Sequence, residues 1–310
     1  MDRHSVSGLD LARLLFEDAA EPAFHDGAPN LFPDLAFGLV GPGSECYRFD
    51  DEISRDNDWG PRLLVWMPDD LPDPDIQRLL TIQQSLPDTI MGYGPVHRTD
   101  AEPFRDGVVP ANLFFQRLIG RDAPPNTLLE WLLTPEWALS LAGNGAVFRD
   151  GAGTVTAWRE HLATYFPEPV WQKKIAVRLK RMGQTAQYNL QRTLRRDDRS
   201  GALNQAALFC REAAALVHHV HRVFVPVEKW LFRSLRDLSD ESREVYTTLS
   251  AFAENHTDTD LLTSAISAVS ETLGASRFSD TVRPFFFDSG RDVEAMIQDE
   301  TIRSVPDSMV

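Results

Sequence analysis

The chain has 310 residues, enough for two domains or one large one, and its hydrophobic content of 43% is ordinary for a globular protein. Its formal net charge of -15 and pI of about 4.9 oppose nonspecific attraction to a phosphate backbone, which argues against nucleic acid as a partner. No apolar run approaches the length of a bilayer span, and the first residues lack the apolar core of a signal peptide. We therefore expect a cytoplasmic protein with no membrane partner. The two cysteines, Cys46 and Cys210, lie far apart and outside any paired metal spacing, which favours free thiols over a zinc site.

The first third of the chain combines predicted helices with short apolar strands. Helical spacing of apolar residues alternates with strand-like apolar runs, and turn residues separate the elements. In chain order we expect a helix over 8–20, a strand-loop-strand over 35–67, a helix over 73–86, a strand near 107–109 and a helix over 112–119. These elements predict a small α/β domain over residues 1–122.

The remainder of the chain, 123–310, has a mainly helical pattern. Two short helices interrupted at Pro135 come first, and the glycine-flanked segment 145–153 is typical of a small hairpin. His218 and His221 share one face of a predicted helix; a metal pair is possible there, but a structural role is favoured because no third ligand is evident. Longer amphipathic helices are predicted over 170–194, 202–224, 241–255 and 258–273, with a shorter helix over 230–238. The predicted fold class is α+β, a small mixed-sheet domain followed by an all-helical domain that binds substrate.

A glycine-rich turn and a pair of acids mark the strand-loop-strand segment. Gly43 and Ser44 follow its first apolar run, and Asp56 and Asp58 precede its second. If the acids begin the second strand, alternation puts both on one face and aims them at one point. Two carboxylates at one point repel each other unless a cation lies between them. Oxygen ligands beside a glycine-rich turn suit Mg²⁺ that carries a phosphate chain.

These residues resemble the signature of the nucleotidyltransferase superfamily, the polymerase-beta-like fold. In that superfamily a Gly-Ser pair is followed by Asp-x-Asp, and the two pairs of this chain match it in order and spacing. The string that continues to Pro61, with the blocks at 145–151 and 229–232, resembles an uncharacterised bacterial family of nucleotidyltransferase-like proteins with a C-terminal helical domain. The resemblance extends over residues 30–240.

The resemblance implies a Mg²⁺-dependent enzyme that moves a nucleoside monophosphate from a nucleoside triphosphate, such as ATP, to a hydroxyl of a small molecule or a protein. Asp56 and Asp58 would be catalytic residues that ligate the metal, with two Mg²⁺ ions bridging the attacking and leaving oxygens. Gly43 and Ser44 would bind the terminal phosphates through the Ser44 hydroxyl and backbone N–H groups. The sequence specifies neither the base nor the acceptor.

A third carboxylate usually completes such sites on a neighbouring strand. Asp106 is the catalytic candidate because it precedes the predicted strand near 107–109, with Glu102 or an acid of the helical domain as alternatives. If none serves, the chain fits a catalytically inactive nucleotide-binding regulatory protein of the same fold. An antitoxin-like partner of a ribonuclease is a further alternative, although the chain is long for one. Asn57 stands where the family usually has histidine, and Arg48 where it has glycine.

The segment 171–196 contains eight basic residues and no acid, which is unusual in so acidic a chain and predicts an anionic ligand. Lys174, Arg178 and Arg181 fall on one helix face at helical spacing. We predict that Arg178, Arg181 and Lys229 bind the nucleotide, in a cleft shared with the predicted metal ligands. The alternatives are a solvated helix face for the arginines and a capping lysine for Lys229.

Overall fold

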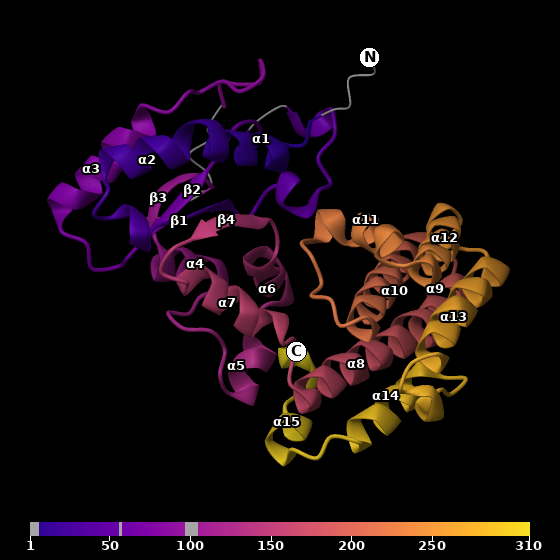
Figure 1. Ribbon diagram of the computed structural model, residues 1–310. Helices are drawn as coiled ribbons and strands as arrows, with labels where there is room; N and C mark the ends of the chain where they lie inside the picture. The colour runs from indigo at the N-terminus through magenta and orange to yellow at the C-terminus, as the bar shows by residue number, and fades with distance from the viewer. Residues whose placement is uncertain (1–5, 56–57, 97–104) are drawn as a thin grey trace. The chain divides into compact units, whose positions relative to one another are not determined.

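The computed structural model describes residues 6–55, 58–96 and 105–310 (Figure 1). A small four-stranded mixed sheet lies in the N-terminal half, and helices dominate the C-terminal half, which confirms the predicted α+β fold class. Within the described residues, no helix is both long and apolar enough to cross a lipid bilayer.

The chain divides into two compact units, neither of which is a single continuous segment. The first unit comprises Met1–Pro124 and Ala138–Thr164, and the second comprises Pro125–Trp137 and Tyr165–Val310. The predicted boundary after residue 122 lies near the first break, but residues 138–164 return to the first unit. The chain therefore passes between the units after residues 124, 137 and 164.

The first unit is built on a sheet with strand order β3-β2-β1-β4. β1 is antiparallel to both of its neighbours, whereas β2 and β3 run parallel. The strands are β1 (Ala36–Leu39), β2 (Leu64–Met67), β3 (Gly107–Pro110) and β4 (Ala146–Asp150). The third strand forms where the sequence predicts one.

The prediction of a hairpin over 145–153 is wrong, because the strand there, β4, pairs with β1 across more than a hundred residues of sequence. Ala36 lies opposite Asp150 and Leu39 opposite Ala146. The two strands approach closely at Gly38, where an added Cβ would lie 2.4 Å from the carbonyl oxygen of Ala146. Only glycine fits that position without a shift of the strands.

Helices cover both faces of this sheet (Figure 1). One face carries α1 (Gly8–Leu15), α2 (Glu21–Gly27) and α3 (Asp73–Gln84), and the other carries α4 (Ala111–Ile119) and α7 (Thr154–Ala163). Because side chains of a strand alternate between its two faces, the strands contribute to one apolar core on each side of the sheet. Phe37 and Val65 belong to the core under the first three helices, whereas Trp66 packs on Phe114 with ring centres 5.4 Å apart. Both faces of the sheet are thus covered by helices (Figure 1).

The second unit is a bundle of helices around α8 and α10. α8 packs against α10 and α14, and α11, α12 and α13 pack in succession. The helices are α5 (Leu128–Leu133), α8 (Glu168–Met182), α9 (Gln191–Arg195), α10 (Arg199–Val220), α11 (Glu228–Leu238), α12 (Asp240–Glu254), α13 (Thr259–Gly274), α14 (Phe286–Ala295) and α15 (Glu300–Ser304). A π-helical segment, Gly183–Leu190, joins α8 to α9, so the predicted helix over 170–194 is continuous. α6 (Glu136–Gly143) contains the break between the units after residue 137.

Candidate functional site

The turn after β1 is held in a conformation that requires glycine. Gly41 and Gly43 have φ of 106° and 151°, a region that side-chain-bearing residues rarely adopt. The Asn144 side chain fixes the turn, accepting a 2.8 Å hydrogen bond from the Gly41 N–H and donating a 2.9 Å one to the Gly41 carbonyl. Among the described residues, the N–H groups of Gly43 and Ser44 have no hydrogen-bond partner. Two fixed N–H donors in a glycine turn can receive an anion.

A buried ion pair lies beside this turn. Glu45 pairs with Arg62, and each residue is 2% exposed. The Glu45 carboxylate lies so near Gly43 that an added Cβ there would be 2.8 Å from it. Arg62 compensates a negative charge that would otherwise oppose an anion at the turn. Glu45 and Arg62 are separated by 16 residues and no motif connects them, so the sequence gives no sign of this pair.

The predicted metal ligands are only partly placed. Asp56 lies outside the described residues. Asp58 is well buried and forms an ion pair with Arg105 at 3.1 Å. It has a φ of 52° and precedes β2 by several residues, so the argument from strand alternation is wrong for it. Asp106 immediately precedes β3 and lines a separate cavity of about 350 Å³ in the first unit. Within the described part of the chain, no three His, Cys, Asp or Glu residues are arranged to hold a metal.

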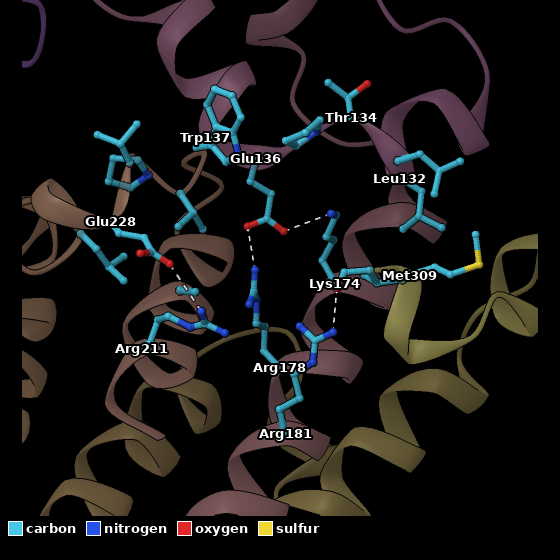
Figure 2. A pocket seen from close by; sticks show the side chains of 18 residues that line it. Leu132, Thr134, Glu136, Trp137, Lys174, Arg178, Arg181, Arg211, Glu228 and Met309 are labelled. Carbon is cyan, nitrogen blue, oxygen red and sulfur yellow. Dashed lines mark hydrogen bonds and ion pairs between the residues drawn. The ribbon is translucent and has the colours of Figure 1, made fainter. Parts of the chain in front are cut away.

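The second unit contains a cavity of about 670 Å³, which we call the basic cavity. Helix α8 contributes the predicted Arg178 and Arg181 to its wall, and Figure 2 shows them with Lys174 and Arg211 around the cavity. The remaining wall comes from residues 132–137, Ala215, residues 225–228, Leu231, Met309 and Val310.

Two buried glutamates organise the charges of the basic cavity. Glu136 accepts from Lys174 at 3.1 Å and from Arg178 at 3.0 Å (Figure 2). The Nε2 atom of His219 lies 3.3 Å from the Glu136 carboxylate. Glu212 accepts from Arg178 at 2.7 Å. Burial raises the pKa of Glu136, but these three neighbours lower it by more, so the pKa lies well below its ordinary value. Burial likewise raises the pKa of Glu212, but Arg178 and its other basic neighbours lower it by more. Both acids are therefore ionised, and Arg178 bridges them.

Acids from other segments also surround the remaining cations of α8. Lys173, which is 1% exposed, pairs with Glu294 at 2.7 Å, and Lys180 pairs with Asp307 at 2.9 Å. In α8, Lys173, Lys174 and Lys180 of the basic run are thus buried and paired with acids, whereas Arg192, Arg195 and Arg196, which follow α8, are exposed. Glu136 was missed because its partners come from distant helices. A usable signal was available, since basic residues interleaved with Ile175 and Val177 must find acids elsewhere.

The other singled-out residues lie apart from the basic cavity's lining. Lys229 is exposed, with its ammonium 4.9 Å from the centre of the Trp230 ring. His218 is buried, donates from Nδ1 to the Ala214 carbonyl at 2.8 Å and accepts from Ser234 at 2.9 Å, as expected for a structural histidine. The two cysteines are free and buried, and burial raises the pKa of each to about 12.

Comparison with known proteins points to the same part of the chain. A family model for a domain of unknown function, DUF4037, matches residues 131–231. No curated protein and no solved structure matches the chain. The matched region contains Glu136, Glu212 and all four basic residues of the basic cavity. It assigns no activity, so any function must be argued from the sites themselves.

Proposed function

We propose that the chain is a Mg²⁺-dependent nucleotidyltransferase that transfers a nucleoside monophosphate from a nucleoside triphosphate to a hydroxyl of a small molecule or protein. The observation that carries the proposal is the glycine turn after β1, whose Gly43 and Ser44 N–H groups have no hydrogen-bond partner among the described residues. A triphosphate needs such fixed donors, because catalysis of phosphoryl and nucleotidyl transfer consists mainly of positioning and charge neutralisation. The likeness of the Gly-Ser and Asp-x-Asp pairs to the superfamily signature supplies the rest.

The residues present suit this chemistry in part. Gly43 and Ser44 would bind terminal phosphate oxygens, and Asp56 and Asp58 would supply carboxylates for Mg²⁺, which would neutralise charge on the phosphates. Arg105 already balances the charge of Asp58. It would have to share that carboxylate with the metal, or turn toward the phosphates. Asp106 remains the proposed third acid, and Lys229, Arg178 and Arg181 remain proposed contacts to the nucleotide.

A second candidate is a nucleotide-binding regulatory protein without transferase activity. It is favoured by the composition of β3, whose Val108, Val109 and Pro110 offer no carboxylate at the strand position where a third acid is expected. The Asp58–Arg105 ion pair favours it as well, because a carboxylate with a resident counter-ion has less need of metal. The two candidates share nucleotide binding and differ only in turnover.

The first test is a thermal unfolding series with ATP, GTP, CTP and UTP, each with and without Mg²⁺. Ligand at a hundred times its dissociation constant should add about 2.7 kcal/mol to the unfolding free energy. The shift should require Mg²⁺ and vanish in Asp56→Asn/Asp58→Asn, whereas the exposed control Asp70→Asn should retain it. Absence of a metal-dependent shift with all four nucleotides would exclude both candidates. Pyrophosphate release in the presence of an acceptor panel would then separate the enzyme from the regulator.

A further inference from the structure

The basic cavity carries more positive charge than its buried acids neutralise. Lys174 and Arg178 are 5% and 15% exposed. Lys174 forms an ion pair with Glu136, and Arg178 forms one with Glu212. The cavity's further acid, Glu228, is 84% exposed, so water and salt screen it. The remaining basic side chains therefore leave a local excess of positive charge in a protein whose net charge is -15.

That excess is concentrated on Arg181 and Arg211. Both guanidinium groups approach the Glu212 carboxylate, at 3.9 Å and 2.9 Å, and Arg178 already binds the same carboxylate at 2.7 Å. Three guanidinium groups thus share one carboxylate. Arg181, 32% exposed, also donates from Nη2 to the main-chain oxygens of Asp307 at 2.7 Å and Val310 at 2.8 Å, which leaves its other nitrogens for a ligand. Arg211 is 44% exposed and is the more reachable of the two. Planar guanidinium forks placed this way suit bidentate binding of a second carboxylate or a phosphate.

The pKa of Arg181 is consistent with this crowding of positive charge. Burial lowers it, Glu212 raises it, and the positive charges of Arg178 and Arg211 lower it further. The net direction is downward. An added anion would relieve the repulsion among these arginines.

Large apolar side chains stand exposed around the same cavity. Leu133 and Trp137 are each 49% exposed and Met309 is 56% exposed, although all three line the cavity. Figure 2 shows Trp137 and Met309 on the wall around the charged groups. Apolar surface of this kind gains from being covered, and a volume of about 670 Å³ is within the range of small-molecule sites.

We propose that the basic cavity binds a small organic anion, a carboxylate or a phosphate carried on an apolar body. Arg181 and Arg211 bind the anionic group, and the apolar body lies against Trp137 and Leu133. The site goes beyond nucleotidyl transfer and rests on contacts within the second unit alone, although Arg181 is also one of the proposed nucleotide contacts. The probes used below contain no nucleotide, so their binding is tested separately from nucleotidyl transfer.

The test measures binding to the full chain by calorimetry with matched probes. The probes are 4-phenylbutyrate, 4-phenylbutyl phosphate, the uncharged 4-phenylbutan-1-ol, acetate and inorganic phosphate. At least one phenyl-bearing anion should bind about tenfold more tightly than both the alcohol and its own small anion, because charge-assisted hydrogen bonds and apolar burial both contribute. Which of the two anions binds tells carboxylate from phosphate. No binding of either at millimolar concentration, or equal binding of anion and alcohol, would overturn the proposal.

Arg211→Gln and Arg222→Gln form a matched pair of variants. Both arginine side chains are 44% exposed and both pair with glutamates, but Arg222 does not line the cavity. Arg211→Gln should weaken binding of the anion about tenfold and leave the alcohol unchanged, whereas Arg222→Gln should leave both unchanged. Equal losses in the two variants would contradict the assignment. Trp137→Ala should weaken the anion and the alcohol alike. The comparison of probes on the unaltered chain decides the matter if a variant fails to fold.

Discussion

Replacing Glu136 with glutamine removes the negative charge between Lys174, Arg178 and His219. The carboxylate lies 3.0 Å from Arg178 and 3.1 Å from Lys174, and at an effective dielectric constant of about 20 each such contact is worth about 5 kcal/mol. The desolvation of Glu136, several kcal/mol, opposes this attraction. Arg178 also keeps Glu212 as a partner. The expected net loss of unfolding free energy is about 3–5 kcal/mol, the range found when one member of a buried pair is removed.

The measurement is urea unfolding followed by helical circular dichroism, with Glu228→Gln as the control. Glu228 is 84% exposed and lies 3.4 Å from Arg211, so its loss should cost less than about 1 kcal/mol. If Glu136→Gln proves no more destabilising than Glu228→Gln, the Glu136 network is not what holds these helices together.

The stability of Glu136→Gln should also depend on pH, and the direction of that dependence can be worked out. Burial already lowers the pKa of Lys174, and removing Glu136, which raises it, should lower it further. Between that lowered pKa and the ordinary lysine value of about 10.4, the unfolded chain binds more protons than the folded chain. The unfolding free energy of Glu136→Gln should therefore rise relative to the unaltered protein between pH 7 and pH 9. If the difference in unfolding free energy between Glu136→Gln and the unaltered protein grows as the pH rises, the reasoning is refuted.

Two further changes test other parts of the molecule. Burial lowers the pKa of His218 to about 4 from 6.5, so stability is lost as pH falls from 6.5 toward 4, by about 2 kcal/mol at pH 5. His218→Gln should lose less over that interval in urea titrations at pH 7 and pH 5, and an unchanged acid loss would show that other groups cause it. Lys229→Ala, at an exposed position, should change stability by less than about 0.5 kcal/mol. If Lys229 binds the nucleotide, calorimetry should show a larger loss for the triphosphate than for the nucleoside, and equal losses would exclude that role.

Most elements could be predicted from the sequence because helices and turns leave local patterns. The buried stripe of α10 shows this, since Phe209, Ala213 and Leu216 are all buried as their spacing predicts. β4 could not be predicted correctly for the opposite reason. Its glycine-flanked segment suggests a local hairpin, whereas the strand pairs with β1, which lies in a distant part of the sequence. Pairing at such separation leaves no mark in either strand alone.

The residues of the candidate sites show the same difference between local patterns, which the sequence reveals, and distant contacts, which it does not. The sequence places Arg178 and Arg181 on one helix face because helical spacing is local, and both line the basic cavity, whereas their binding of a nucleotide stays a prediction. The pairing of Glu136 and Glu212 with the cations of α8 could not be predicted. A single acid on one helix does not indicate which cation of another helix it contacts. The Asp-x-Asp pattern singles out Asp58, but no sequence pattern connects Asp58 to its ion-pair partner Arg105. A motif therefore identifies residues more reliably than it identifies their partners.

The chain passes three times between its two units, and this limits where it can be cut into fragments that fold. A fragment limited to residues 131–231 would contain β4 without β1, its neighbour in the sheet, and α8 without α14, which packs along it. A cut after residue 122 would likewise separate β1 from β4. We therefore expect that the span matched by the family model, residues 131–231, does not fold by itself. Proteolysis or recombinant expression guided by that span should yield unfolded or aggregating pieces, because each would expose the edge of a strand or the apolar side of a helix.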